Sequence, residues 1–332
     1  MMKRLVVGLL LGVGVASLGG WLLHRLLHTP GPPLSQPVRI YIPERSTLRT
    51  TAEILVSAHL LTNPRLFLVW ARLTKQDRKI QEGEYLFTAA LSPVDILRLL
   101  SKGATLRYAV TVVEGMTFQQ IVHVLVEKGL GAADQFWCLS RDPQFLAAWG
   151  LPPLGLEGYL YPATYQFSRR ATPEVILGQM IARFYAALSP ALYRQMAASG
   201  FSVHQIITLA SLIEKETAVA AERTLVSAVF HNRLRQQMPL QCDSTVIYGV
   251  PEFDGNLTRQ HLTTPSPYNT YLLRGLPPGP IASPSRESIV AALNPASSAY
   301  LYFVAKGDGT HEFSVDLAAH NRAVRRFQKR QS

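Results

Sequence analysis

The chemistry suggested by this sequence centres on one glutamate in a long apolar segment. Residues 202–220 have the pattern of a helix, in which Glu216 shares one side with Leu212 and Val219. Burial in such a stripe favours the protonated carboxyl, which can donate a proton to a leaving oxygen, as the acid of a glycosidase does. The same position also suits a structural glutamate paired with a nearby arginine such as Arg233.

Further acidic residues could assist Glu216. An ordinary glycoside hydrolase uses two carboxyl groups, roughly 5 Å apart when configuration is retained and 6.5–9.5 Å apart when it is inverted. Glu157, Glu214 and Asp243 are the candidates for a second carboxyl. Helix geometry turns Glu214 away from Glu216 by about 200°. The sequence leaves the number of participating carboxyl groups open.

Long motifs surround this glutamate. The run ASLIEKETAVAAERTLVSAVFHNRL spans residues 210–234. Further motifs are LEGYLYPATYQF (156–167), LQCDSTVIYG (240–249), TPSPYNTYLLRGLPPGPIASPS (264–285) and YLYFVAKGDGTHEFSVDLAAHN (300–321). In these motifs and their order, the whole chain resembles the endolytic murein transglycosylases of the YceG-like family. The resemblance implies that the catalytic residue is the second Glu of Glu-Lys-Glu-Thr, which here is Glu216.

The resemblance also implies a substrate and a reaction. The substrate is uncrosslinked or nascent peptidoglycan glycan, cleaved without water between N-acetylmuramic acid and N-acetylglucosamine. Glu216 first protonates the glycosidic oxygen and then takes a proton from the C6 hydroxyl of the muramyl sugar, which closes a 1,6-anhydro ring. The family further implies a role near the membrane in terminating growing strands, beside a peptidoglycan synthase.

Polar residues in the matching segments are candidates for binding this glycan, and each also has a structural explanation. Gln241 and Asp243 follow a proline on an expected extended segment, where Asp243 could stabilise positive charge on the sugar or cap the next helix. Tyr268, Asn269 and Tyr271 could contact an acetamido sugar or form a turn. The predicted substrate-binding set is Glu157, Glu214, Asn232, Gln241, Asp243, Tyr268, Asn269 and Tyr271.

The chain departs from the family pattern at two places. Ala163 stands where an acidic residue commonly follows the proline of the 156–167 motif. Asp243 is flanked by Cys242 and Ser244, whereas the family usually has Thr or Ser at the first of these positions and Pro at the second. The cysteine could alter the rim of the cleft or respond to oxidation. We expect neither departure to touch the catalytic glutamate.

The elements that must position these residues indicate an α+β fold. Residues 108–332 are expected to form a mainly helical, lysozyme-like catalytic domain with short β segments. Residues 38–107 are expected to form a small α+β domain that loosely resembles a wall-binding LysM module. The two domains share an internal repeat, because 38–61 aligns with 108–131 as a strand, a turn and a helix.

The N-terminus predicts the compartment. Residues 5–23 are apolar and uncharged, and as a helix they reach roughly 28 Å, close to the thickness of a bilayer core. We expect a cytoplasmic tail (1–4), an uncleaved transmembrane anchor (5–27) and a stiff, Pro-rich linker (28–37). The protein would then be a single-pass protein of the inner (plasma) membrane with its catalytic domain outside the cytoplasm. A cleaved signal peptide is the alternative.

Composition excludes several classes of protein. Lys and Arg outnumber Asp and Glu by 33 to 22, which favours anionic lipid or a carboxylate-rich wall polymer as partner. Without a basic block or a nucleic-acid-binding motif, nucleic acid is not expected. The histidines show no metal-ligand spacing, so neither a metal nor a cofactor is expected. Two rival functions remain, namely a non-catalytic, membrane-tethered wall-binding scaffold and a muramidase that uses water.

Overall fold

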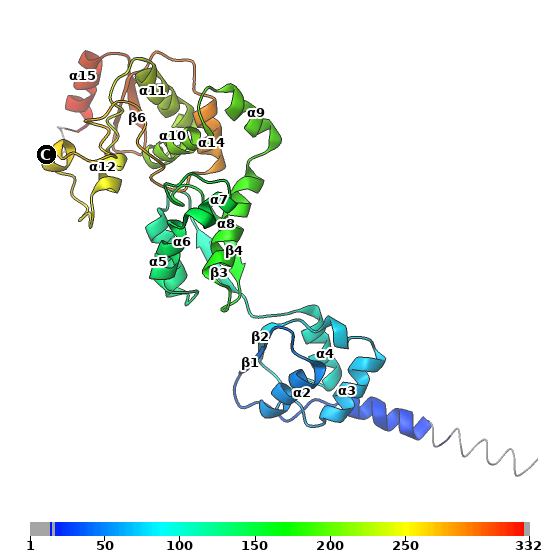
Figure 1. The fold of residues 1–332 in the computed structure, drawn as a ribbon. Helices are drawn as coiled ribbons and strands as arrows, with labels where there is room; N and C mark the ends of the chain where they lie inside the picture. The colour runs from blue at the N-terminus through cyan, green and yellow to red at the C-terminus, as the bar shows by residue number, and fades with distance from the viewer. Residues whose placement is uncertain (1–13, 15–16, 329–332) are drawn as a thin grey trace, which may run out of the picture. The chain divides into compact units, whose positions relative to one another are not determined.

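The computed structural model describes residue 14 and residues 17–328 (Figure 1). The predicted cytoplasmic tail (1–4) and residues 5–13, 15 and 16 of the predicted anchor (5–27) lie outside the described residues. The chain divides into two compact units, Met1–Tyr108 and Ala109–Ser332. Each unit combines helices with short strands that pair into two-stranded sheets, so the predicted α+β class is confirmed.

In the first unit, two antiparallel strands pack against three helices. Strands β1 (Val38–Ile42) and β2 (Gly83–Phe87) pair from Val38 opposite Phe87 to Ile42 opposite Gly83. Their alternate side chains, with Ile40 and Tyr85 among them, are buried with residues of the helices. The helices are α2 (Leu48–Ser57), α3 (Pro64–Leu73) and α4 (Pro93–Lys102), with the 3₁₀ turn η1 (Asp77–Lys79) between the last two.

The described N-terminal segment is helical through residues 17–28 and is fastened to the first unit. Leu27, in its last turn, is only 1% exposed. The N–H of Gly31 donates a hydrogen bond of 3.1 Å to the carbonyl of Leu91. The predicted linker over 28–37 therefore starts in contact with the first unit and not as a free spacer.

Along the described residues, no single helix is both long enough and apolar enough to cross a bilayer. Helices α8 (Pro173–Ala187) and α9 (Pro190–Ala198) reach that length and composition only together, as a pair bent by 76°.

The second unit is mostly helical. It opens with the expected repeat of a strand and a helix, β3 (Tyr108–Val112) and α5 (Phe118–Glu127), where Thr117 caps the helix as Thr47 caps α2 in the first unit. Strand β3 pairs with β4 (Ala163–Phe167). Between these strands and beyond α8 and α9 lie α6 (Ala133–Ser140), α7 (Pro143–Ala148), α10 (Val203–Glu216), η2 (Ala220–Glu222), α11 (Arg223–Arg235), α12 (Asp243–Gly249), α13 (Arg259–Thr263) and α14 (Arg286–Leu293).

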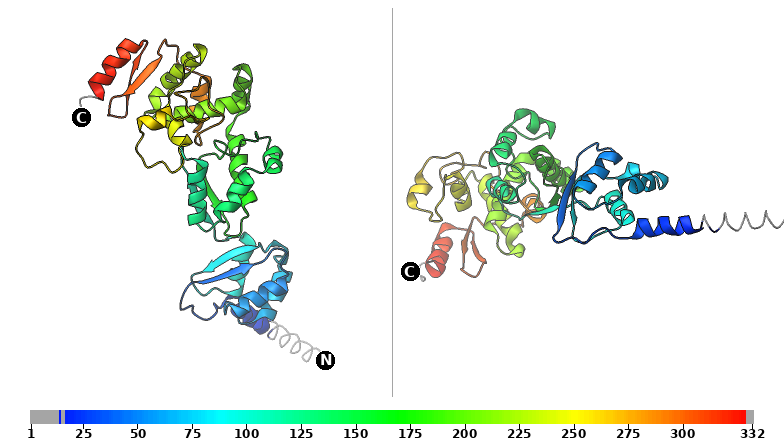
Figure 2. Two further views of the ribbon diagram at one scale, coloured as in Figure 1. Left: turned by 60° about the vertical axis from the view of Figure 1, so that its left-hand side comes forward. Right: turned by 90° about the horizontal axis from the view of Figure 1, so that it is seen from below.

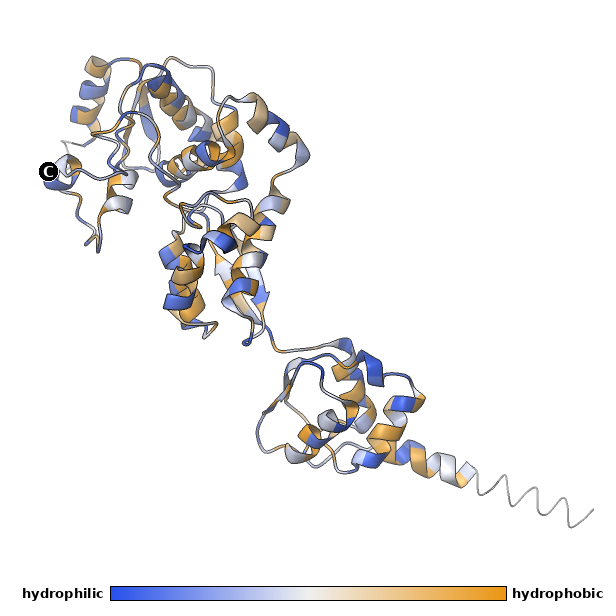
Figure 3. Cartoon of the chain, viewed as in Figure 1, coloured by the Kyte–Doolittle hydropathy of each residue, from blue (hydrophilic) through white to orange (hydrophobic). Residues whose placement is uncertain are grey.

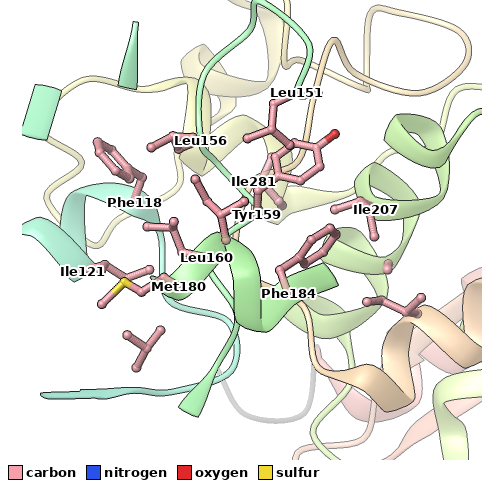
Figure 4. Close-up of a cluster of buried hydrophobic side chains, with 14 of the residues drawn as sticks. Phe118, Ile121, Leu151, Leu156, Tyr159, Leu160, Met180, Phe184, Ile207 and Ile281 are labelled. Atoms are coloured by element: carbon pink, nitrogen blue, oxygen red, sulfur yellow. The ribbon is translucent and has the colours of Figure 1, made fainter. Parts of the chain in front are cut away.

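Helix α10 is the central element of this unit. It starts at a capping box in which Ser202 and Gln205 satisfy each other's backbone N–H groups, and all residues from Ile206 to Ile213 are buried. Hydrophobic residues gather where α10 meets α14 (Figure 3). Figure 4 shows Ile207 of α10 in one apolar cluster with Phe184 of α8 and residues near α5. A fully packed α10 gives its last residues a rigid support.

The chain ends in a hairpin and a helix. Strands β5 (Tyr302–Ala305) and β6 (His311–Ser314) pair antiparallel, and the chain turns between them over 306–310. Helix α15 (Leu317–Phe327) lies against both strands (Figure 2). The side chain of Glu222 accepts hydrogen bonds from the N–H (3.1 Å) and Nδ1 (2.7 Å) of His311 and so ties the hairpin to the start of α11.

Candidate active site

Glu216 is the last residue of α10, because the chain leaves the helix at Thr217 with extended backbone angles. The predicted helix over 202–220 is therefore four residues too long, and Val219 does not continue an apolar stripe beyond the carboxyl. The side chain is instead partly exposed. It borders a cavity of about 490 Å³ in the second unit. A carboxyl at the end of a buried helix is held firmly and is still reachable by a ligand.

The cavity has a polar side and a mostly neutral side. One part of the lining is charged or polar and consists of Glu216, Arg233, Gln241, Asp243 and Tyr271, together with the apolar Leu240. The remaining lining residues come from the C-terminal hairpin and helix: Tyr302, Phe303, Val304, Ala305, His311, Leu317, His320, Asn321, Val324 and Gln328. A cavity of this size is in the range of small-molecule binding sites.

Two side chains hold one oxygen of Glu216. The hydroxyl of Ser244 donates a hydrogen bond of 2.7 Å to Oε1, and the thiol of Cys242 donates one of 3.1 Å to the same atom. The expectation that the departures at 242 and 244 would not touch Glu216 is therefore wrong. Sequence reasoning found these residues only as departures from a pattern, because their contact with Glu216 joins segments 26 and 28 residues apart.

Cys242 acts as a donor because its thiol stays protonated. Burial raises its pKa well above the usual range, and the adjacent Glu216 carboxylate raises it further. Cys242 and Cys138 are both free thiols. The buried, protonated state of Cys242 makes its sulfur a poor nucleophile.

Arg233 shapes the loop that carries these donors. Its guanidinium donates hydrogen bonds to the carbonyls of Leu301 (2.6 Å), Pro239 (3.1 Å) and Leu240 (3.0 Å), and to Oε1 of Gln241 (3.0 Å). The alternative of a Glu216–Arg233 ion pair does not hold among the described residues. Burial lowers the pKa of Arg233, and backbone carbonyls take the place of a counter-ion.

Asp243 and Tyr271 face the cavity as a pair. The Tyr271 hydroxyl donates a hydrogen bond of 2.6 Å to Oδ1 of Asp243, the first residue of α12. Burial and the neighbouring Asp243 carboxylate raise the pKa of Tyr271. The tyrosine therefore remains a donor, and the carboxyl group of Asp243 lies in the same cavity as that of Glu216.

Glu157 belongs to a separate cluster. Its carboxylate accepts hydrogen bonds from the N–H of Phe118 (3.0 and 3.1 Å), at the start of α5, and from the Tyr248 hydroxyl (3.2 Å). Burial raises its pKa to about 7, against the effect of these hydrogen bonds and of nearby Lys215. The predicted residue Tyr268 packs beside this cluster, with its ring 4.8 Å from that of Tyr248.

Three other predicted residues hold the fold together. Glu214 accepts hydrogen bonds from the N–H (2.8 Å) and hydroxyl of Ser285, the N-cap of α14. The Asn232 amide donates to the carbonyls of Ser298 (2.9 Å) and Tyr300 (2.8 Å). The fully buried Asn269 amide donates to three carbonyls of the loop at 261–264. These amides and this carboxylate are already satisfied within the protein.

Comparisons with known proteins identify the family. The model of the YceG-like family matches residues 40–326. The chain belongs to the YceG-like family.

Relatives of this family resemble the chain over most of its length. The endolytic murein transglycosylase of Bacillus subtilis (strain 168) is 33% identical over 307 residues, which cover 87% of this chain and 84% of the relative. The protein of that name from Streptococcus pneumoniae serotype 2 (strain D39) is 30% identical over 358 residues, which cover 97% of this chain and 65% of the relative. The chain thus spans about two thirds of the length of the streptococcal relative.

A solved structure agrees with the fold. The crystal structure of a YceG-like protein from Listeria monocytogenes is 31% identical and superposes with a TM-score of 0.60, covering 86% of this chain and 99% of that one.

In this YceG-like chain, the cavity gathers part of the predicted site and adds to it. Of the predicted residues, it brings together Glu216, Gln241, Asp243 and Tyr271. The cavity lining within the described residues does not include Glu157, Glu214, Asn232, Tyr268 or Asn269. Residues of α15 were missed, although the spacing of 317, 320, 321, 324 and 328 places them on one helix face and could have indicated a wall.

Across residue 14 and residues 17–328, no three His, Cys, Asp or Glu side chains are grouped so that they could hold a metal ion.

Proposed function

We propose that this chain is a peptidoglycan lytic transglycosylase with Glu216 as its catalytic residue. The single observation that carries the proposal is the position of Glu216, which stands at the end of a buried helix and on the wall of a cavity. Membership of a family whose curated relatives are named endolytic murein transglycosylases supplies the substrate class.

One carboxyl is enough for the proposed reaction. Protonated Glu216 donates its proton to the glycosidic oxygen between N-acetylmuramic acid and N-acetylglucosamine, and the bond from that oxygen to the muramyl C1 breaks. The resulting carboxylate then removes the proton from the C6 hydroxyl of the same sugar as its oxygen bonds to C1. The proton returns to Glu216, no water is consumed, and the product carries a 1,6-anhydro end.

The hydrogen bonds around Glu216 suit a carboxyl group that first donates a proton and then accepts one. Oε1 accepts from Ser244 and Cys242, whereas Oε2 accepts no hydrogen bond from any described residue. A carboxyl whose one oxygen is fixed can present the other to the substrate in a defined direction. Oε2 is therefore the proposed carrier of the proton.

A water-using muramidase is the second candidate, and the location of Asp243 favours it. Asp243 lines the same cavity as Glu216, which is the arrangement that a two-carboxylate hydrolase needs. In the first proposal Asp243 instead stabilises the positive charge that develops on the muramyl ring.

The chemistry of the products separates the two candidates. Purified glycan strands are incubated with the full chain, and the products are analysed by mass spectrometry. Transglycosylation yields 1,6-anhydromuramyl ends, each lighter than a reducing end by one water. Products with reducing ends only would establish hydrolysis and overturn the non-hydrolytic reaction.

The membrane anchor, the wall-binding first unit and the cellular role are part of the same proposal. Support for an anchor comes from the helix at 17–28, which exposes Leu18, Trp21, Leu22, Leu23 and Leu26. An anchored enzyme with its catalytic unit outside the cytoplasm would meet nascent strands where they are made, and could terminate them beside a synthase. The β1–β2 pair with its helices is proposed as the LysM-like module that binds the glycan.

A further inference from the structure

One face of α15 forms a wall of the cavity that borders Glu216. The residues of this inner face are three to four positions apart, which places them within one stripe of the helix. They are Leu317, His320, Asn321, Val324 and Gln328, the last at the C-cap. Glu216, Gln241 and Asp243 line the same cavity, so a ligand that reaches the carboxyl also meets this face.

The inner face carries no formal charge, in contrast to the rest of the helix. Burial and nearby Arg233 lower the pKa of His320, so its imidazole is neutral at pH 7. Arg322 and Arg326 lie on the opposite side of α15, about 140° and 180° from Leu317, whereas Arg325, about 80° from Leu317, borders the inner face without lining the cavity. A face of this kind suits an uncharged ligand better than a carboxylate or a phosphate.

The chemistry of the inner face alternates between polar and apolar groups. The amide of Asn321 and the imidazole of His320 stand among the aliphatic side chains of Leu317 and Val324. N-acetylated sugars have the complementary surface, with hydroxyl and amide groups at their edges and C–H groups and an acetyl methyl between them. Such a ligand can satisfy both kinds of contact at once.

His320 is held in place by a stack of rings. Its imidazole lies 5.1 Å from the ring of Tyr302 at an interplanar angle of 23°, and the guanidinium of Arg233 lies 5.0 Å from the centre of that ring. The stack connects α15 to α11, and its three residues line the same cavity as Glu216. Among the described residues, Nδ1 of His320 is buried and has no hydrogen-bond partner. A buried polar atom without a partner is uncommon in a folded protein.

We infer that the inner face of α15 is a glycan-binding wall, which contacts the uncharged sugar backbone next to the bond cleaved at Glu216. The inference rests on the proposed function and adds to it a set of sugar-contacting residues. It also excludes the charged stem peptides as the ligand of this face.

A binding experiment tests the wall separately from catalysis. The full chain in detergent carries Glu216→Gln, so that it binds without cleaving. The probe is short glycan strands from which the stem peptides have been removed, and a two-site fit separates the Kd of the cavity from that of the proposed glycan-binding first unit. Asn321→Ala and Leu317→Ser are added singly and together. Both residues are exposed at the cavity, so the fold should tolerate the changes. We expect each change to raise Kd about fivefold, the equivalent of one hydrogen bond or one small apolar contact, and the pair about twentyfold.

Matched controls lie on the other side of the same helix. Arg322→Gln and Arg326→Gln remove charge and should leave Kd for the stripped strands within twofold. Equal Kd values for the double variant and its Glu216→Gln parent would overturn the inference that this face binds glycan. Cleavage by the wild-type chain would in that case still support the proposed function. Weakened binding only to strands that retain stem peptides would also overturn it, in favour of a peptide site. Absence of both binding by the parent and cleavage by the wild type would contradict the proposed function itself.

Discussion

Two donors from one short segment, Cys242 and Ser244, converge on one oxygen of Glu216. A thiol is a weak donor, and a hydroxyl bound to a carboxylate is a stronger one. In the pattern that the sequence resembles, a hydroxyl residue stands at 242 and a proline at 244. In this chain the stronger donor is therefore Ser244, in the first turn of α12, and the weaker donor is Cys242 at its N-cap.

Replacing the carboxyl itself should abolish most of the activity. Glu216→Gln keeps the shape and the hydrogen bonds to Oε1 but cannot cycle a proton, so turnover of glycan strands should fall at least about 10²-fold, a typical contribution of a positioned acid–base group. Glu214→Gln, on the same helix but bound to Ser285, should instead lower thermal stability and keep most of the turnover. Near-normal turnover in Glu216→Gln would contradict the mechanism.

Removing the stronger donor should impair the same step to a smaller extent. Ser244→Ala deletes the 2.7 Å hydrogen bond to Oε1, and a hydrogen bond to a charged group is worth about 1.5–3 kcal/mol. We expect kcat to fall about tenfold or more while KM changes little, because the bond orients Glu216 and does not touch the substrate.

Two variants complete this test. Ser244→Thr keeps the hydroxyl and should retain most of kcat. The double variant Cys242→Thr/Ser244→Pro restores the family pattern, and its kcat should also be higher than that of Ser244→Ala. Equal activity of Ser244→Ala and the wild type would show that Ser244 does not position the carboxyl.

Residue types alone could not separate ligand-binding amides from structural ones. Asn269 lies in an aromatic, polar loop that suggested a sugar contact, but its amide already donates hydrogen bonds to three carbonyls of a neighbouring loop. Asn232 is used in the same way. The position of Glu216 on the cavity wall agrees with a candidate chosen from a local motif, whereas the partners of these amides are set by how distant loops meet.

At the scale of elements, helix beginnings were easier to predict than helix ends. The start of α10 follows from the Ser202–Gln205 capping box, which is local. Its end at Glu216 does not follow from the apolar period, since Val219 would continue the stripe. The helix stops where α12 supplies donors to the last carboxyl, and that is a tertiary contact.

Glu157 connects two elements, and its ionisation should destabilise the fold. It bridges the start of α5 to Tyr248 of α12, and burial raises its pKa to about 7. The folded state therefore binds a proton more tightly than the unfolded state, whose carboxyl titrates near the ordinary value of about 4.3. Between about pH 4.5 and 7 the folded state holds a proton that the unfolded state has released, so the free energy of unfolding decreases as the pH rises, until Glu157 ionises in the folded state near pH 7.

Glu157→Gln should remove this pH dependence. Between pH 5 and pH 8 the wild type should lose on the order of 2 kcal/mol of unfolding free energy relative to the variant. Denaturant melts of both proteins at several pH values measure the difference, and other titrating groups cancel in the comparison. Parallel pH profiles for the two proteins would show that Glu157 does not titrate in this range.

At the scale of the whole molecule, the proposed anchor decides where the chemistry takes place. Full-length protein should stay in the membrane fraction after a high-salt wash, because an apolar run is not released by screening charge. A reporter enzyme that works only outside the cytoplasm should be active when fused to the C-terminus. A mature N-terminus near residue 18 would contradict the anchor, since it would mean that the apolar run had been cleaved.

The tie between the N-terminal helix and the first unit has a geometric consequence. Because Leu27 is buried in that unit and the N–H of Gly31 is hydrogen-bonded to Leu91, the helix and the first unit should turn together as one body. Each residue added to the helix ahead of Leu27 would turn the first unit by about 100° around the helix axis and shift it by about 1.5 Å along that axis. With the proposed anchor in the bilayer, the rotational phase of the first unit over the membrane would thus be set by a residue count. Inserting one residue would change that phase sharply, whereas inserting seven would nearly restore it.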